Sequence, residues 1–353
     1  MFALAREIQK RRTRSKPTKE SDRAPAIDTP RESPRVGSAP GMGVVEVSHL
    51  KKCYGALAAV DDLSFSVHAG EIFSFLGPNG AGKTTTVEIL EGLRDRTGGD
   101  VRVLGADPWT DLEHVKRRVG VVPQDFHFFP KLTPREALDL YARLFGVRAD
   151  TERLLERVEL IDKANDRYDT LSGGQKQKLG VALALVNDPE ICFLDEPTTG
   201  LDPRARRAIW QVIRNLRDEG RTVFLTTHYL DEAQQLSDRI AIINRGRLVA
   251  SGSPTDLIAR FGRPERIRIR GTEQLAEQLK QRGLPVDAHD GTIEVVLRTR
   301  ADATPVLQLL ASERFPWDSF STASDSLEDV FIQLVGRVEE GSVTPAPEGE
   351  VAT

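Results

Sequence analysis

The segment Gly77–Thr84, GPNGAGKT, constrains the fold of this chain more than any other stretch. It follows the apolar run EIFSFL, which predicts a strand, and it opens KTTTVEILEGL, whose pattern is typical of a helix. In that context it matches G-x-x-x-x-G-K-[ST] in full. Glycines let backbone N–H groups curl around a phosphate, and the helix N-terminus adds positive potential. The segment therefore predicts a nucleotide-phosphate site.

Three side chains of this loop have individual roles in the prediction. Lys83 reaches the β- and γ-phosphates, the Thr84 hydroxyl binds Mg²⁺, and Thr85 donates to the α-phosphate. The rest of the cradle is expected to comprise Gly77, Pro78, Asn79, Gly80, Ala81 and Gly82.

The run ICFLDEP places two acids after an apolar strand. Asp195, at the strand end, is expected to hold Mg²⁺ directly or through water. Glu196 faces differently and is expected to polarise the attacking water as general base. The alternative interpretation is that both acids only cap the following turn.

The stretch LSGGQKQK, from Leu171 to Lys178, places two glycines side by side ahead of the apolar run LGVALALV. A flexible linker would not lead directly into a buried helix. The stretch therefore predicts a rigid loop at a helix N-terminus, a geometry suited to binding an anion.

Composition limits the class of protein. The 353 residues allow two domains, and 39% hydrophobic with 29% charged residues is typical of a soluble globular protein. A net charge of −4 argues against a nucleic-acid partner. No apolar run approaches the roughly 18 residues that span a bilayer, so any membrane role is expected to be peripheral. Cys53 and Cys192 lack metal-ligand spacing and suit a reducing cytoplasm, and Cys192 is expected in the core.

Composition and periodicity divide the chain into four parts. Residues 1–42 carry ten Lys/Arg against five Asp/Glu, a net of +5, and predict a disordered basic arm. One hypothesis is that this arm contacts anionic lipid. The alternative is that translation starts at Met42, so that the arm is not part of the protein. Residues 43–262 contain the motifs, with a helical insert at about 125–180. Residues 263–337 predict a small α+β domain of three strands and three helices, and residues 338–353 a disordered tail.

Two helix starts are explicit in the sequence. Asp202 is the expected N-cap of PRARRAIWQVIRNLRDEG, which lies between the apolar runs ICFLDEP and TVFLTTH and so predicts an α/β core. In the insert, Thr133 and Glu136 form a capping box. The stripe that follows at helical spacing is expected to face a core: Leu138, Tyr141, Leu144 and Phe145.

The motifs GPNGAGKT, LSGGQ, LDEP and LTTH, in this order, resemble the nucleotide-binding subunit of an ABC transporter over about residues 44–262. The stretch YLDEAQQLSDRIAIINRGRLVASGSP and the terminal SLEDVF are similar to the drug- and antibiotic-export branch, daunorubicin-resistance-like and of ABC-2 type. The resemblance implies an α/β P-loop NTPase cassette with a RecA-like core, an antiparallel β subdomain and a helical subdomain. It also implies ATP and Mg²⁺ as cofactors.

The resemblance further implies that two copies meet head to tail around two ATP molecules. The segment that would complete the partner's site comprises Ser172, Gly173, Gly174 and Gln175. Asp202 matches the acidic residue that crosses this interface.

Three other residues match positions of the family. Tyr54 matches the aromatic residue that stacks on adenine, with an exposed loop tyrosine as the alternative. Gln124 matches the glutamine that senses Mg²⁺ and the attacking water and links the core to the membrane partner. His228 matches the histidine that contacts the γ-phosphate.

The function that the resemblance implies is ATP hydrolysis driving export of drugs, antibiotics or other amphipathic compounds. The partner would be a separately encoded ABC-2 type permease, with this chain on the cytoplasmic face of the membrane. The alternatives are export of lipid, polysaccharide or sodium, and a soluble ABC ATPase without a transporter. A ribosome factor would carry two cassettes and a repair ATPase a long coiled-coil insert, whereas a simple P-loop kinase or GTPase leaves LSGGQ and LTTH unexplained.

Overall fold

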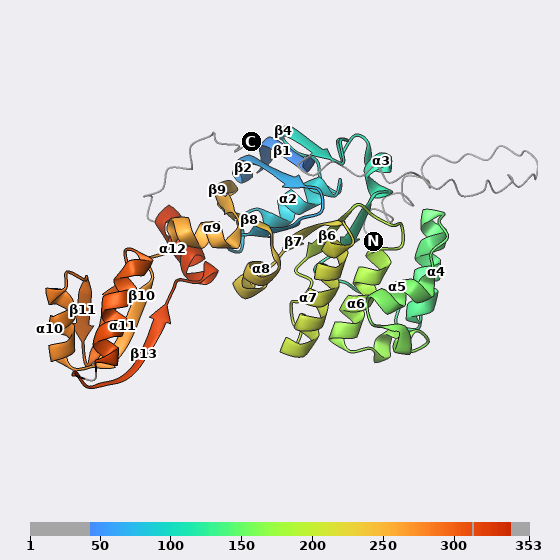
Figure 1. Cartoon of the computed structure of the whole chain (residues 1–353). Coiled ribbons are helices and arrows are strands. Elements are labelled where there is room, and N and C mark those ends of the chain that lie inside the picture. The colour runs from blue at the N-terminus through green and yellow to red at the C-terminus, as the bar shows by residue number, and fades with distance from the viewer. Residues whose placement is uncertain (1–42, 313, 340–353) are drawn as a thin grey trace, which may run out of the picture. The chain divides into compact units, whose positions relative to one another are not determined.

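A computed structural model describes residues 43–312 and 314–339, which form two compact units (Figure 1). Unit 1 comprises residues 43–75, 79–226 and 245–247, and unit 2 comprises the other described residues. None of the helices within these ranges is long and apolar enough to cross a membrane. The predicted arm at 1–42 lies outside the described residues, as does the predicted tail except for its first two residues.

Unit 1 contains an antiparallel and a parallel sheet. The antiparallel sheet has the order β2-β1-β4, with bounds Leu57–His68, Gly43–Tyr54 and Gly98–Val103. Four parallel strands have the order β5-β6-β7-β3, with bounds Val119–Val122, Ile191–Asp195, Thr222–Thr226 and Ile72–Leu76. Strands β3 and β7 are buried along their whole length, as their apolar runs require in a sheet that is covered on both faces.

A cluster of phenylalanines joins the two sheets of unit 1. Phe65 of β2 stacks on Phe73 of β3 with ring centroids 5.6 Å apart, and it lies 5.3 Å from Phe75. Phe224 of β7 contacts both of these β3 rings and also Phe193 of β6. Because such ring pairs add about 0.5–1.5 kcal/mol each beyond their burial, the cluster fixes β6 and β7 beside β3.

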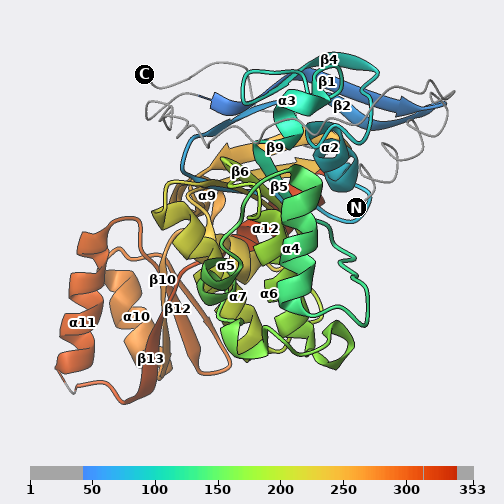
Figure 2. The same cartoon turned by 90° about the vertical axis from the view of Figure 1, so that its right-hand side faces the viewer.

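The helices of unit 1 include the predicted insert. In both views α4, α5 and α6 lie side by side (Figure 2). The bounds of the six α-helices, α2 to α7, are Lys83–Leu90, Leu112–Lys116, Pro134–Phe145, Thr151–Arg157, Gly173–Ala184 and Pro203–Asp218. Two 3-10 turns, η1 (Ile161–Lys163) and η2 (Tyr168–Thr170), connect α5 to α6.

The first turn of α4 confirms the predicted capping box. The Thr133 hydroxyl accepts from the Glu136 N–H at 3.2 Å, and the Thr133 N–H donates to the Glu136 carboxylate at 2.9 Å. The expectation that the whole stripe of α4 faces a core is wrong, since Leu144 is 48% and Phe145 38% exposed. The buried face of α4 ends at Ala142, so its last turn leaves these side chains uncovered.

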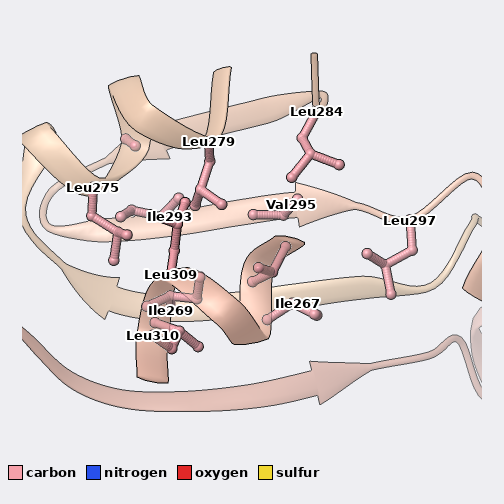
Figure 3. Close-up of a cluster of buried hydrophobic side chains, with 12 residues drawn as sticks. Ile267, Ile269, Leu275, Leu279, Leu284, Ile293, Val295, Leu297, Leu309 and Leu310 are labelled. Atoms are coloured by element: carbon pink, nitrogen blue, oxygen red, sulfur yellow. The ribbon is translucent and has the colours of Figure 1, made fainter. Parts of the chain in front are cut away.

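Unit 2 contains a four-stranded antiparallel sheet with its own core. Leucines of α10 and α11 pack on alternate residues of β10 and β12, among them Ile269 and Ile293 (Figure 3). The sheet order is β11-β12-β10-β13, with bounds Val286–His289, Thr292–Val296, Arg266–Gly271 and Trp317–Ala323. The helices are α10 (Glu273–Gln281), η3 (Arg300–Asp302) and α11 (Ala303–Ala311). Strand β11 is a fourth strand beyond the three expected, because VDAH is too short and polar to predict one.

The last helix, α12 (Leu327–Glu339), shares a second core of unit 2 with earlier elements of the chain. Its Leu327, Val330 and Leu334 are buried with residues of these elements, and the Leu327 N–H donates to the Gln234 side-chain oxygen at 3.1 Å. The earlier elements are α8 (Leu230–Leu236), β8 (Arg239–Asn244), β9 (Arg247–Gly252) and α9 (Pro254–Phe261). A chain truncated after Gly262 would lose α12 and expose this core.

The burial of α12 predicts how its residues contribute to stability. Leu327→Ala should destabilise unit 2 by about 2–5 kcal/mol, because Leu327 is fully buried and the substitution leaves a cavity. Ile332→Ala, on the same helix but 62% exposed, is the matched control and should change stability by less than about 0.5 kcal/mol. Urea denaturation of the two variants measures the difference, and equal midpoints would contradict the shared core.

Candidate active site

The loop between β3 and α2 ends at Gly82, whose backbone is left-handed with φ +101°. A Cβ at this position would lie 2.4 Å from the Ala59 carbonyl oxygen, so only glycine fits. Since Gly82 is also the N-cap of α2, no side chain of the cap residue bonds to the first-turn amides. The first intrahelical bond runs from the Thr86 N–H to the Gly82 carbonyl, and the preceding amides have no intrahelical acceptor. This arrangement suits a phosphate.

Lys83 is the first residue of α2 and is only 9% exposed. Burial lowers the pKa of its ammonium group, while the negative charges of Glu196 and Asp195 act in the opposite direction. Lys83 and the two acids therefore share one electrostatic site. Next to Lys83, Thr84 is exposed and Thr85 is half-buried.

Asp195 ends β6 beside Thr226, the last residue of β7. Burial raises the pKa of the Asp195 carboxyl, and the hydrogen bond from the Thr226 hydroxyl and the charge of Lys83 counteract that rise. The Thr226 hydroxyl thereby orients the carboxylate that the sequence assigned to Mg²⁺.

Glu196 has a left-handed backbone, with φ +47°, which is unusual for a residue with a side chain. Its N–H is held by the carbonyl and the hydroxyl of Thr226, each at 3.1 Å. One carboxylate oxygen accepts from the Gln124 amide at 3.0 Å and from the Thr199 hydroxyl at 3.1 Å. A conformation of this kind costs about 1–3 kcal/mol and persists where surrounding contacts enforce it. The turn thus presents the Glu196 carboxylate in a fixed direction.

The structure adds Thr226 and Thr199 to the residues that the sequence singled out. Thr226 contacts both acids, and Thr199 contacts Glu196. A signal for Thr226 was present, because it ends the apolar run TVFLT and strands β6 and β7 are neighbours. No comparable signal marks Thr199, whose role depends on the turn after β6.

The Leu171–Lys178 stretch leads into α6 as predicted. Ser172 is the N-cap, and it exchanges hydrogen bonds with Gln175 at 2.8 and 3.3 Å. A Cβ at Gly174 would lie 2.8 Å from the Ala205 Cβ, so the start of α6 packs tightly against the start of α7. There Asp202 caps α7 by accepting from two backbone N–H groups at 2.9 Å each. The structure thus brings Ser172–Gln175 and Asp202 into one surface region.

Four more residues of the predicted site are Tyr54, Gly77, Pro78 and His228. Tyr54 is the last residue of β1 and is 41% exposed. Gly77, Pro78 and His228 belong to unit 2, where His228 is exposed and its ring lies 4.1 Å from that of Tyr229. The contacts of these four residues with a nucleotide remain predictions.

The donors available for a metal ion are oxygen atoms. Among the described residues no group of three or more His, Cys, Asp or Glu side chains could hold one. Mg²⁺ needs no such cage, since it commonly binds through one or two protein oxygens, phosphates and water. Asp195 and Thr84 fit that pattern.

Comparison with known proteins agrees with this geometry. The family model described as ABC transporter matches residues 60–199. The Nod factor export ATP-binding protein I of Paraburkholderia xenovorans (strain LB400) is 41% identical over 302 residues, covering 83% of this chain and 97% of that protein. Its namesake in Rhizobium etli is 38% identical, covering 85% and 95%. The chain belongs to the ABC transporter ATP-binding proteins.

Solved structures of this family support the same assignment. The structure of an ATP-binding subunit of an ABC transporter matches with a TM-score of 0.56 and 29% identity, covering 62% of this chain and 93% of that one. A dimeric post-hydrolysis state of an ATP-binding cassette with ADP and Pi matches with a TM-score of 0.54 and 29% identity, covering 59% and 98%. As a member of the family, the chain is an α/β P-loop ATPase coupled to transport.

One acid near the site was not singled out by the sequence. Burial, together with the nearby charges of Asp195 and Glu88, raises the pKa of Glu91, which directly follows α2, to about 8. Between its ordinary pKa and about 8, the folded chain keeps a proton on Glu91 that the unfolded chain releases. Stability due to this group is therefore full at low pH and is lost as pH rises through that window.

The pKa of Glu91 predicts a pH-dependent stability difference. Without nucleotide or metal, Glu91→Gln should melt at least about 2 °C above the unmodified chain at pH 8, because it removes the cost of ionising Glu91. The difference should shrink towards pH 4.5. Melting curves across this range measure it, with the exposed Glu156→Gln as control for the substitution itself. A pH-independent difference would contradict the assignment.

Proposed function

We propose that this chain hydrolyses ATP to drive export of an amphipathic compound through a separate membrane-spanning permease of ABC-2 type. The observation that carries the hydrolytic part is the turn at Glu196, which is strained and held by Gln124, Thr199 and Thr226. The export part is supported by near full-length similarity to proteins named for Nod factor export. The exported compound is then a drug, an antibiotic or a Nod factor, and the chain acts on the cytoplasmic face of the membrane.

In this proposal the loop Gly77–Thr85 wraps the phosphates of ATP. The buried ammonium of Lys83 pairs with the β- and γ-phosphates, in place of the two acids that now compensate its charge. Asp195, Thr84 and Gln124 would hold Mg²⁺, which neutralises charge on the phosphates when it is bound.

Glu196 then accepts the proton of the attacking water. Its direction is fixed by Gln124 and Thr199, so a water on the γ-phosphate side meets an oriented carboxylate. We assign His228 to the γ-phosphate and Tyr54 to the adenine ring.

A second copy of the chain completes each site in this proposal. The capped start of α6 presents the Gly173 and Gly174 amides beside an exposed Ser172, and this is the segment proposed to bind the γ-phosphate held by the other copy. Asp202 lies beside it at the start of α7, which supports its place at the interface. The dimeric cassette with ADP and Pi provides a precedent.

The permease is proposed to contact the helical insert. Phe129, Leu144 and Phe145 are 59%, 48% and 38% exposed. Phe129 and Phe145 belong to an aromatic cluster in which Phe128 contacts both Phe129 and Tyr141, and Tyr141 contacts Phe145. Because Gln124 is only a few residues from Phe128 in the chain, movement of this surface would reach the hydrolytic site directly.

Glu196→Gln tests the hydrolytic assignment. The amide keeps the shape of the side chain but cannot take a proton, so turnover should fall by about 10²–10⁴-fold while ATP binding persists. Steady-state phosphate release and equilibrium binding of ATP measure the two properties. Near-normal turnover in the purified variant would remove Glu196 as the base.

Export itself is tested by substitution in a relative's host. The chain should restore Nod factor export in a Rhizobium etli strain that lacks its own Nod factor export ATP-binding protein I, and Glu196→Gln should not. Each is supplied with the host's membrane subunit and, separately, with a candidate ABC-2 type membrane subunit from the organism that encodes this chain. Antibiotic resistance gained in place of Nod factor export would identify a drug as the exported compound. If the chain restores neither Nod factor export nor antibiotic resistance with either membrane subunit, that result would count against export.

Mixing two defective variants tests whether the Ser172 segment acts on the other copy. Ser172→Arg places a bulky cation where a phosphate must approach, and Lys83→Ala removes the phosphate-binding ammonium. Each should be inactive alone, but their heterodimer has one site with both lesions and one intact site. ATPase activity should therefore return on mixing and be highest at equal amounts. No recovery, although the heterodimer forms, would contradict the shared site.

A further inference from the structure

Tyr54 lies at an exposed hairpin tip where little packing fixes its ring. It ends β1 and pairs with Leu57, the first residue of β2, which is 67% exposed. An unsupported ring at such a tip would have to be ordered when a base stacks on it, at a cost in affinity. Whatever holds the ring beforehand therefore contributes to binding of the base.

Two cations approach this ring. The Arg94 guanidinium carbon lies 5.4 Å from the ring centroid, and the Lys52 ammonium lies 5.3 Å from it. Both distances are within the range of cation–π attraction. The two differ in how they are themselves held.

Arg94 is anchored on α2. Its Nε donates to the Glu88 carboxylate at 2.5 Å, and its backbone N–H donates to the Glu88 carbonyl at 3.1 Å. Interactions with Glu88 and with Tyr54 both raise the pKa of the guanidinium. By contrast, no carboxylate in the described part of the chain bonds to Lys52, which lies within β1 and carries its ammonium on a flexible stem.

The ion pair between Glu88 and Arg94 links the Tyr54 ring to the helix that follows the phosphate loop. Helix α2 begins at Lys83, and Glu88 follows it five residues later, which is roughly 7.5 Å along the helix axis. The same short helix therefore bears the phosphate-binding end and the acid that holds Arg94 against Tyr54. The side chains of Arg94 and Glu88 are 36% and 30% exposed, so the ion pair itself adds little to folding stability.

We propose that Glu88 and Arg94 are positioning residues for the nucleotide base, because their ion pair holds the Tyr54 ring in the orientation that stacks on adenine. This inference rests on the proposed role of Tyr54. In this proposal α2 fixes the distance between the phosphate loop and the Tyr54 ring that stacks on the base. Lys52 has no positioning role.

The test compares ATP with inorganic tripolyphosphate, which has the phosphates without the base. Binding is measured by displacement of a fluorescent ATP analogue from the full chain. Tyr54→Ala should weaken ATP binding by about 5- to 150-fold, the loss of one base stack. Arg94→Ala and Glu88→Gln should each weaken it by about two- to fivefold. All three should leave tripolyphosphate binding unchanged, and Lys52→Ala should change neither ligand.

The double variant Tyr54→Ala with Arg94→Ala should bind ATP no more weakly than Tyr54→Ala alone, because Arg94 acts through the ring. If Tyr54→Ala leaves ATP binding unchanged, the proposed base platform fails. If Tyr54→Ala weakens ATP but Arg94→Ala and Glu88→Gln do not, only the positioning role is overturned. Equal losses for ATP and tripolyphosphate, or additive losses in the double variant, would also overturn it.

Discussion

The site depends on the burial of an ammonium group beside two carboxyl groups. Moving an ion from water into a protein costs roughly several kcal/mol, even after the protein relaxes around it. Opposite charges and hydrogen bonds must converge on the ion to offset this cost. Lys83 has Asp195 and Glu196 as opposite charges, and the Thr226 hydroxyl donates to the Asp195 carboxylate and accepts from the Glu196 backbone N–H. These groups converge only if β7 lies next to β6, because Thr226 and Asp195 end the two strands. The phenylalanine cluster that fixes the order of β6, β7 and β3 is therefore also a requirement of the site.

Three helix starts in unit 1 show how local sequence separates structural from ligand-binding ends. Asp202 at the start of α7 satisfies two amides with its own carboxylate. Ser172 and Gln175 form a capping box at the start of α6. The two residues between them are glycines, so no side chain covers their amides. Gly82 at the start of α2 has no side chain to offer. Side-chain capping of the first-turn amides thus decreases from α7 through α6 to α2. The helix start with the least side-chain capping, that of α2, is the one that the motif assigns to phosphate.

Much of the fold and part of the site followed from local sequence. The strands around the phosphate loop, the capping box of α4 and the cap of α7 each depend on a few adjacent residues, and all were predicted. The exposure of Leu144 and Phe145 was not, because periodicity shows which residues share a helix face but not where the covering elements end. Thr199 and the Arg94–Glu88 pair were also missed. Their roles depend on a left-handed turn and on a hairpin reaching the end of α2, which are tertiary features.

The C-terminal residues are less independent than their separate sheet suggests. Sequence periodicity assigned the segment after residue 262 to one small domain, yet its last helix leaves the four-stranded sheet and completes the core of α8 and α9. Gln234 of α8 accepts from the first residue of α12, and α8 begins two residues after His228. Leu327, Val330 and Leu334 are buried in that core, so the C-terminal segment packs on α8 as well as on its own sheet. The fold therefore uses the end of the chain to cover the helix that begins two residues after His228.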